Sequence, residues 1–494
     1  MTGGLRVVAI ADADSFVKWS ASLLGSVPGI RPHLLLVRTP LTASAAQERT
    51  ALAGTGLDPA AVSRIVFGET GPWLEAQRPD VVLLAGRGPF VRLMGRVVDS
   101  LTHRPVTVAG LPGMAIPAQR GALDYRRYAD LLVVHSHREE RAFAELGARI
   151  GAQVPTALAT LPFARARERM LSPEPVRIGG GRGPKAPLGW EETRAPGGDP
   201  VRAEVLVHST AASSTASSAD GASSNEGAAS SLPVRRCPAT DLVFAAQALV
   251  PMAREERAEI ASTLVRAAHA DPDRRVVVKL RSRPGEAETH RERDSYSELL
   301  DGRRPENLVF SYESMASALR TAAGLVTVSS TAAIEAVAQG VPVIALDSFG
   351  VSKSLLNTVF IGSGLLGGRS EVVAGRFRHP HPGWLRDNYF HPESESTWWE
   401  RVEALVALRR AGALPARRVP AARGGALHES WHRASVLGRE DRTATGRVAL
   451  ALGAPATRVI GAVRRGRSQG LGTWDDATTD ITLEPNPFHD SIRR

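Results

Sequence analysis

The sequence predicts an α/β protein with two domains, each built on a mostly parallel sheet covered by helices. In both halves of the chain, short apolar runs alternate with longer amphipathic or alanine-rich stretches of helical length. A stretch of small polar residues separates the halves. The 494 residues also exceed the ~250–300 at which a single hydrophobic core stops growing. These observations favour two domains joined by a linker over one large domain.

The first domain is expected at residues 1–171. Six apolar runs there have the length of buried strands, and stretches such as Arg138–Leu146 between them have the pattern of helices. The runs are Leu5–Ile10, His33–Val37, Arg64–Phe67, Asp80–Ala85, Val106–Ala109 and Leu131–His135.

Residues 172–236 break this alternation. The segment is rich in glycine, serine and alanine, which cannot bury enough apolar surface to offset the entropy of ordering. We therefore expect a disordered insertion between the domains.

The alternation resumes over residues 237–411, which we assign to the second domain. The expected strands are Asp241–Ala246, Arg275–Leu280, Asn307–Phe310, Leu325–Val328 and Val341–Leu346, and the expected helices are Arg254–Ala268, Ser314–Ala322, Ala332–Gln339 and Lys353–Phe360. From 412 to 494 the sequence is rich in arginine, alanine and glycine. We expect a basic, weakly ordered tail there.

Composition excludes several classes of protein. The single cysteine, Cys237, cannot form an intramolecular disulfide, and no apolar run is long enough for a transmembrane segment. The N-terminus lacks the features of a signal peptide, so we expect a cytoplasmic protein. The net charge of +10 leaves contact with an anionic membrane surface open. We do not expect nucleic-acid binding, because no basic and aromatic reading motif accompanies the charge.

The segment from Gly324 to Leu346 carries the strongest functional signal. A strand leads into Ser329-Ser330-Thr331, and a helix carrying Glu335 follows. At the carboxyl edge of a parallel sheet, hydroxyl groups, free backbone N–H groups and a helix start can hold a phosphate. Glu335 stands one turn further along and can accept hydrogen bonds from ribose or sugar hydroxyls. The alternative is that Ser330 or Thr331 only caps the helix.

This segment resembles the donor-site signature of glycosyltransferases of the GT-B fold, which have two Rossmann-like domains. The resemblance implies that Ser329, Ser330 and Thr331 bind the phosphates of a nucleotide sugar and that Glu335 binds the ribose. Over its whole length the chain resembles an actinobacterial family assigned to the glycosyltransferases without a defined substrate. This resemblance implies that the protein transfers a sugar, either in polysaccharide biosynthesis or to a small molecule.

A second element is the strand Arg275–Leu280, whose carboxyl end presents Lys279 and Arg281. Cations at this point can neutralise the charge that builds on a departing nucleoside phosphate without a metal. The run is similar to the Lys-x-His-Pro motif of capsule-polysaccharide and sialic-acid transferases. Here Arg281-Ser-Arg283-Pro stands where that motif has His-Pro, so the identity of the donor stays open. Ordinary exposed cations are the alternative reading.

The first domain is expected to hold the acceptor. Asp12 and Asp14 follow the first strand, where a carboxylate can deprotonate an acceptor hydroxyl. We expect Asp14 to be the base, with helix capping as the alternative role of this loop. Lys18 follows in the same segment. The chain has four lysines, and three of them, Lys18, Lys279 and Lys353, are expected near a sheet edge.

Two histidines end the last expected strand of the first domain. The imidazoles of His135 and His137 can act as a base or as a phosphate ligand. Ser136 and Glu139, however, have the spacing of a capping box, which favours a structural role for this stretch.

The sequence as a whole predicts a metal-independent glycosyltransferase that moves a sugar from a nucleotide-sugar donor to a hydroxyl of a glycan or a small molecule. We expect no cofactor beyond the nucleotide sugar. Two alternatives remain: an enzyme like the UDP-N-acetylglucosamine 2-epimerases, which share the fold but typically show an Asp-Ser-Gly-Gly turn, and a nucleotide-sugar-binding protein without turnover.

Overall fold

The computed structural model of the chain describes residues 4–152, 154–162, 164, 239–280, 292, 294–417, 425–446 and 448. The described residues of both halves of the chain belong to one compact unit. The insertion expected at 172–236 lies outside the described residues, as do Arg281 and Arg283.

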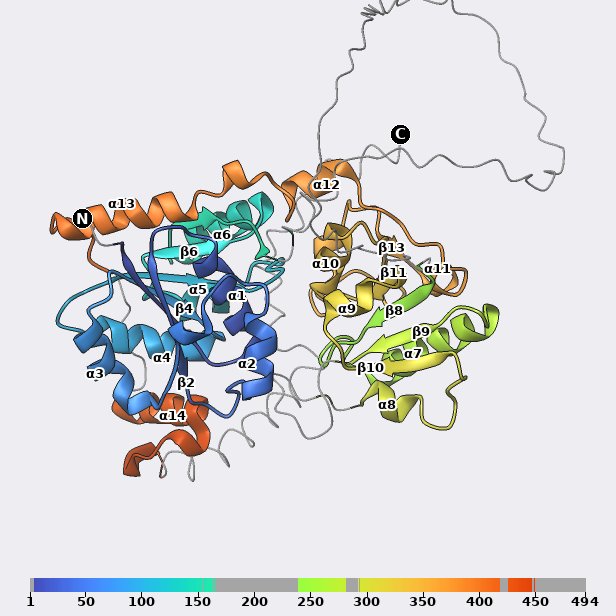
Figure 1. The fold of residues 1–494 in the computed structure, drawn as a ribbon, viewed down its shortest axis with the longest axis horizontal. Helices are drawn as coiled ribbons and strands as arrows, with labels where there is room; N and C mark the ends of the chain where they lie inside the picture. Colours follow the sequence, from blue (N-terminus) through green and yellow to red (C-terminus); the bar gives the residue numbers. More distant parts are fainter. Residues whose placement is uncertain are drawn as a thin grey trace, which may run out of the picture. The chain divides into compact units, whose positions relative to one another are not determined.

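The N-terminal domain contains a seven-stranded sheet in the order β3-β2-β1-β4-β5-β6-β7, with every pair parallel (Figure 1). Its strands are β1 (Arg6–Ala11), β2 (Arg31–Val37), β3 (Val62–Ile65), β4 (Val81–Ala85), β5 (Val106–Gly110), β6 (Leu131–Val134) and β7 (Thr156–Leu158). Continuous apolar runs form these strands because helices bury both faces of the sheet.

The C-terminal domain contains a six-stranded sheet in the order β10-β9-β8-β11-β12-β13. Its strands are β8 (Asp241–Ala245), β9 (Val276–Lys279), β10 (Leu308–Ser311), β11 (Ala322–Thr327), β12 (Val343–Leu346) and β13 (Leu366–Gly367), and their pairs are parallel as well. The expectation of two Rossmann-like β/α/β domains is confirmed.

The helices that follow the strands divide between the faces of each sheet. Those of the N-terminal domain are α1 (Asp14–Gly25), α2 (Ala45–Leu52), α3 (Phe67–Gln77), α4 (Gly88–Asp99), α5 (Arg120–Tyr125) and α6 (His137–Ile150). Alternate residues of β1 point to opposite faces, so Val7 and Ala9 pack with α1, whereas Val8 and Ile10 pack with α3 and α4.

The C-terminal sheet has the same two-sided packing. Its helices are α7 (Arg254–Ala270), α8 (Tyr296–Leu299), α9 (Met315–Leu319), α10 (Ala332–Ala338), α11 (Arg369–Val373) and α12 (Pro382–Asp387). Leu242 and Phe244 of β8 pack with α7, α8 and α11, while Val243 and Ala245 share a cluster with α9 and α10.

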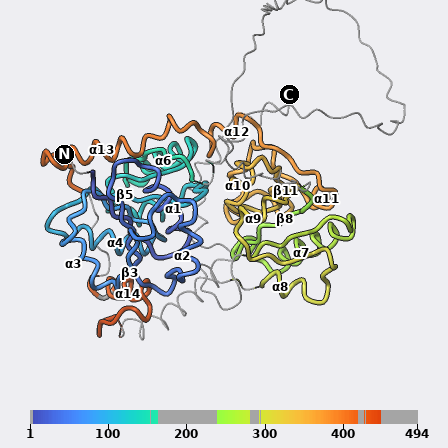
Figure 2. The backbone as a smooth tube through the Cα atoms, in the orientation of Figure 1, coloured from blue at the N-terminus to red at the C-terminus, as the bar shows by residue number. Residues whose placement is uncertain are grey.

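After α12 the chain returns to the N-terminal sheet. Helix α13 (Trp398–Arg410) lies beside the N-terminal domain (Figure 2). The side chains of Trp398, Val402 and Val406 are buried in the same cluster as α1. Beyond α13, α14 (Gly425–Leu437) packs on α4 within the segment expected to be a weakly ordered tail, and most of that segment lies outside the described residues.

Four sequence expectations of local structure are wrong. Phe67 begins α3 instead of ending β3, and β7 and β13, with three and two residues, were not expected. The helix expected to reach Ala322 ends at Leu319, because Thr321 and Asp241 are joined by two hydrogen bonds that bring Ala322 into β11.

The helix expected at Lys353–Phe360 is also wrong. Leu356 has a φ of 54°, in the left-handed region, and only Thr358–Phe360 forms a 3₁₀ turn. The side chain of Asn357 replaces a helical ladder: its amide donates to the carbonyls of Leu346 and Gly350, and its oxygen accepts from the Ser352 N–H. This segment is therefore a loop closed around Asn357.

Candidate functional site

Each sheet contains one point where the order of its strands reverses. In the N-terminal sheet this point lies between β1 and β4, and in the C-terminal sheet it lies between β8 and β11. Ligands of open parallel sheets bind outside the carboxyl ends of the strands at such points, because the loops on either side diverge there. Four loops lie at the carboxyl ends of the strands beside these two points. They begin at Asp12 and Arg87 in the N-terminal domain and at Gln247 and Ser329 in the C-terminal domain.

Gln247 links the two loops at the reversal point of the C-terminal sheet. Its Oε1 accepts a hydrogen bond of 2.9 Å from the Ser329 N–H, and its Nε2 donates over 3.2 Å to the Ser329 hydroxyl. The Thr327 hydroxyl also approaches Oε1, at 3.4 Å. The side chain of Gln247 therefore fixes the start of the hydroxyl-rich turn.

The N–H groups of this turn are already used by the protein. Besides the Ser329 N–H, the Ser330 N–H donates to the Thr327 hydroxyl and the Ala332 N–H donates to the Ser330 hydroxyl. The expectation of free backbone donors is wrong for these three groups. A phosphate here must replace internal acceptors, so the hydroxyls and nearby cations become the larger source of binding energy.

A buried arginine that the sequence analysis missed supports the Gln247 loop. Arg257, on α7, donates from its guanidinium to the carbonyls of Gln247 and Asp294, at 2.8 and 2.6 Å, and pairs with Glu292. Its side chain is almost fully buried. Since three separate segments depend on one guanidinium, this part of the carboxyl edge is built as a fixed unit.

Glu335 lies in an electropositive environment contributed by both domains. Burial raises the pKa of this carboxyl group, while Lys18 of α1 and Lys279 at the end of β9 act in the opposite direction. Lys279 is buried, and its ammonium donates to the Leu280 carbonyl. The structure thus brings together Lys279, Glu335 and Lys18, although the sequence indicated only that each lies near a sheet edge.

Asp12 is buried at the reversal point of the N-terminal sheet. Its carboxyl group is 1% exposed; Oδ2 accepts a 3.4 Å hydrogen bond from the Thr39 hydroxyl, and Oδ1 has no partner among the described residues. Burial raises its pKa to about 6, and the Arg87 guanidinium acts in the opposite direction. A carboxyl group in this state can accept a proton near neutral pH.

Asp14 is in a different setting from Asp12. It is the first residue of α1, is only partly buried, and follows Ala13, whose side chain forms no cap. A carboxylate in the first helical turn is stabilised by the helix dipole. The alternative role as a helix cap is wrong for Asp14, because Ala13 occupies the cap position.

The buried histidine His135 is committed to the core. Its Nε2 accepts a 2.7 Å hydrogen bond from the Trp19 indole, and its Nδ1–H donates to the Ala159 carbonyl over 2.8 Å. With both ring nitrogens used, it has no capacity for catalysis. His137, partly buried at the start of α6, lies 2.5 Å from Glu395. The hydroxyl of Ser136 caps that helix as expected, but the Glu139 carboxyl group accepts from the His135 N–H instead of the Ser136 N–H, so the expected capping box is only half formed.

A cavity of about 300 Å³ adjoins the hydroxyl-rich turn. The loop that follows β5 forms most of its wall, and Phe143, Leu356, Ser329 and Thr331 complete it. Gly113 of that loop passes close to Thr331, since a Cβ at Gly113 would lie 2.8 Å from the Thr331 methyl group. One end of the cavity therefore belongs to the turn for which phosphate binding is expected.

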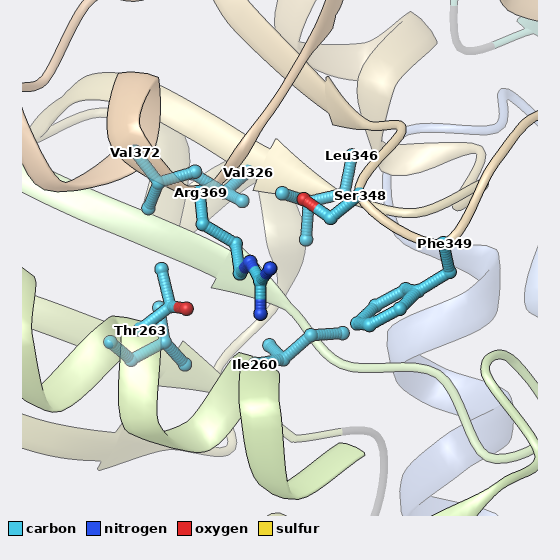
Figure 3. A pocket seen from close by; sticks show the side chains of 9 residues that line it. Ile260, Thr263, Val326, Leu346, Ser348, Phe349, Arg369 and Val372 are labelled. Carbon is cyan, nitrogen blue, oxygen red and sulfur yellow. The ribbon is translucent and has the colours of Figure 1, made fainter. Parts of the chain in front are cut away.

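A second recess, between α7, α11 and the strands, is occupied by packing (Figure 3). Ile260 and Thr263 of α7 face Val326 and Leu346, and the Arg369 side chain reaches between them to pair with Glu259 at 2.5 Å. This recess supports the contact between α7 and α11.

The described residues meet the requirements of neither a metal site nor a membrane-spanning helix. They include no cluster of three or more His, Cys, Asp or Glu side chains placed to hold a metal ion. None of their helices is both long and apolar enough to cross a membrane.

Residues 7–179 and 205–405 match the family described as "Putative glycosyltransferase (DUF6716)". The chain belongs to this family. The match covers strands from β1 to β13 and both reversal points, so the family assignment concerns the two domains together. No curated protein matches the sequence.

Several solved structures are similar to this chain. A "putative UDP-N-acetylglucosamine 2-epimerase" from Listeria monocytogenes has 11% identity and a TM-score of 0.50, covering 84% of this chain and 100% of its own. The UDP-GlcNAc 2-epimerase of Methanocaldococcus jannaschii, solved with UDP-GlcNAc and UDP, has 11% identity, a TM-score of 0.48 and coverages of 81% and 99%.

The plant protein UGT73P12 of Glycyrrhiza uralensis, complexed with glycyrrhetinic acid 3-O-monoglucuronide, has 8% identity, a TM-score of 0.43 and coverages of 94% and 100%. At such identities similarity concerns the fold alone. The fold is that of the GT-B enzymes, as the sequence predicted.

Proposed function

We propose that this protein is a metal-independent glycosyltransferase that moves a sugar from a nucleotide-sugar donor to a hydroxyl of a glycan or a small molecule. Family membership supplies the general class of reaction. The observation that carries the proposal is the convergence of Lys18, Lys279 and Glu335 beside the turn that Gln247 holds.

On the donor side, Ser329, Ser330 and Thr331 are proposed to contact the phosphates. Lys279, and Arg281 just beyond it, would neutralise the charge that develops on the departing nucleoside phosphate, which is the task that a metal performs in other glycosyltransferases. Glu335 would accept hydrogen bonds from the ribose hydroxyls, and Lys18 and Lys279 oppose the rise that burial causes in its pKa.

On the acceptor side, we propose Asp12 as the base, in preference to Asp14. Asp12 has an unpartnered buried oxygen and a pKa of about 6, whereas Asp14 begins a helix. In the transfer, the acceptor oxygen bonds to the anomeric carbon while the bond from that carbon to the phosphate oxygen breaks. The electron pair leaves with the nucleotide, and the hydroxyl proton passes to Asp12.

A thermal-shift screen of nucleotides and nucleotide sugars tests the donor site, since a ligand of the native state raises the apparent melting temperature. With the best ligand, Glu335→Gln and Lys279→Met should each weaken binding about tenfold by calorimetry, equivalent to ~1.4 kcal/mol. Glu306→Gln, an exposed residue of the same domain, is the control and should bind as the wild type does. Equal binding by all four proteins would refute the site.

The second candidate function, epimerisation of the nucleotide sugar, is favoured by the hydroxyl-rich turn that leads to a helical carboxylate. Incubation with a nucleotide sugar alone separates the two, because epimerisation needs no acceptor. Release of nucleotide only when an acceptor is present supports transfer. Tight nucleotide binding with no reaction in either assay would instead identify a binding protein.

A further inference from the structure

The cavity beside Thr331 is lined mostly by apolar side chains. Leu111, Met114 and Ile116 of the loop after β5 and Phe143 of α6 supply apolar side chains, whereas Gln119, Ser329 and Thr331 supply polar ones. Of the described residues that line it, none is charged. The volume of about 300 Å³ lies at the small end of the ~300–1,000 Å³ range of ligand pockets.

This lining is unsuited to a sugar. Every sugar hydroxyl that is buried without a partner costs ~1–3 kcal/mol, and the described lining offers a single amide, that of Gln119, and no carboxylate. An apolar body of one or two rings gains ~25 cal/mol for each Å² of apolar surface removed from water. The cavity therefore discriminates in favour of an apolar ligand.

The loop after β5, which forms most of the cavity wall, is fixed by a hydrogen bond to Glu139. Oε1 of Glu139, on α6, accepts a 2.8 Å hydrogen bond from the Ala115 N–H in the middle of the loop after β5. The same oxygen accepts from the Tyr389 hydroxyl. A loop fixed at its centre keeps the cavity formed in the absence of ligand, which reduces the ordering cost of binding.

We infer that the acceptor is an apolar small-molecule alcohol or phenol, bound with its body between Leu111, Met114 and Phe143 and its hydroxyl toward Thr331. This rests on the proposed function, because the role of acceptor follows from the position of the cavity beside the donor turn. The hydroxyl oxygen bonds to the anomeric carbon and its proton passes to Asp12, the base proposed above. The bond from the anomeric carbon to the phosphate oxygen breaks, and its electron pair leaves with the nucleotide.

The first experiment measures binding and does not need turnover. Ligand-observed NMR with the full chain should detect 2-naphthol at concentrations where methyl glucoside gives no signal. Leu111→Glu places a charge among the apolar side chains of the cavity and should weaken naphthol binding at least tenfold. Leu408→Glu, the same change on the exposed face of α13, should bind as the wild type does. Preferential binding of methyl glucoside would overturn the inference.

The second experiment measures transfer from the donor that the thermal-shift screen identifies. Transfer to 2-naphthol, with its KM raised at least tenfold in Leu111→Glu and unchanged in Leu408→Glu, is the expected result. If Leu111→Glu fails to fold, as judged by its melting temperature, Met114→Glu replaces it. Transfer to sugars alone refutes this inference and leaves the proposed function standing, whereas naphthol binding without any transfer refutes the proposed function and leaves the apolar site standing.

Discussion

The hydroxyl of Tyr389 donates a hydrogen bond of 2.7 Å to Oε1 of Glu139, although 250 positions separate the two residues. Both side chains are fully buried. Glu139 also accepts from the N–H groups of Ala115 and His135, each at 2.8 Å. One carboxyl group thus connects α6, the wall of the cavity and the segment after α12, and its ionisation state affects all three.

The first prediction concerns the pH dependence of stability. Burial raises the pKa of Glu139 from 4.5 to about 7, although its three hydrogen bonds and Arg138 act in the opposite direction. Between these values the folded protein binds more protons than the unfolded chain, so the contribution of Glu139 is fully present below pH ~4.5 and is lost as the pH rises through ~7. At ~1.4 kcal/mol per pKa unit, the loss is on the order of 3 kcal/mol.

Urea denaturation at pH 5 and pH 8 measures this loss. Glu139→Gln should remove most of the difference, whatever its effect at a single pH. Glu145→Gln changes a partly exposed carboxylate of the same helix and should keep the wild-type difference. The raised pKa of Asp12 also lowers stability as the pH rises, but over a lower pH range. Its contribution is the same in the wild type, Glu139→Gln and Glu145→Gln. A wild-type pH difference in Glu139→Gln would show that another group is responsible.

The second prediction concerns Gln247. Replacing it with alanine removes the acceptor of the Ser329 N–H and the donor to the Ser329 hydroxyl, so the turn loses its fixed geometry. We expect the free energy of unfolding to fall by ~1–2 kcal/mol and nucleotide affinity to fall about tenfold. Gln77→Ala, at an exposed position at the end of α3, should change neither quantity.

Gln247→Glu separates the effect of the hydrogen bond to Ser329 from the effect of charge near the turn. The carboxylate can still accept from the Ser329 N–H, but it adds a negative charge beside the proposed phosphate site. We therefore expect it to weaken nucleotide binding more than Gln247→Ala while costing less stability. Calorimetry and denaturation on the two variants give the comparison, and the reverse order of affinities would argue against phosphates at this turn.

The sequence predicted the parts of the fold that depend on local patterns. Buried parallel strands are continuous apolar runs, so β1, β4, β8 and β9 were located to within one or two residues. The hydroxyl-rich turn and Glu335 were found for the same reason, because a strand, a turn and a helix follow one another directly. Their proposed roles remain predictions.

What the sequence did not predict depends on which strands are neighbours. Gln247 has no motif around it, and it reaches Ser329 only because β8 pairs with β11, about 80 residues later. Arg257 and the influence of Lys18 on Glu335 likewise follow from tertiary packing. The loop around Asn357 was mistaken for a helix because its apolar spacing is helical, whereas the side-chain hydrogen bonds that override this spacing are not visible in a pattern.

The third prediction concerns Arg417, which follows α13 and fixes the returning chain to the N-terminal domain. Its side chain is 6% exposed and pairs with Asp130 and Asp99, at 3.0 and 2.9 Å. Arg417→Ala should cost ~2–4 kcal/mol, less than the loss of an isolated buried pair because Arg104 still neutralises Asp130. Arg410→Ala, at an exposed arginine, should stay within ~0.5 kcal/mol of the wild type. Chemical denaturation checks both values.

The last prediction tests the contact between Gly113 and Thr331. In Gly113→Ala the new methyl group would lie 2.8 Å from the Thr331 Cγ2, so the loop or the turn must shift by a few tenths of an ångström. If the turn binds the donor phosphates, nucleotide affinity should fall three- to tenfold. Gly121→Ala, where the nearest atom is 3.9 Å away, should bind normally and gain ~0.5–1 kcal/mol of stability as a helical alanine.

The double variant Gly113→Ala/Thr331→Ser identifies the cause of that loss. Serine keeps the hydroxyl proposed to contact phosphate and removes the methyl group that collides with Ala at 113. We therefore expect calorimetry to show affinity restored to within about twofold of Thr331→Ser alone, because the steric conflict is gone while the polar group remains. If the double variant binds as weakly as Gly113→Ala, the loss arises from the backbone of the loop after β5, and the cavity wall, not the turn, controls donor binding.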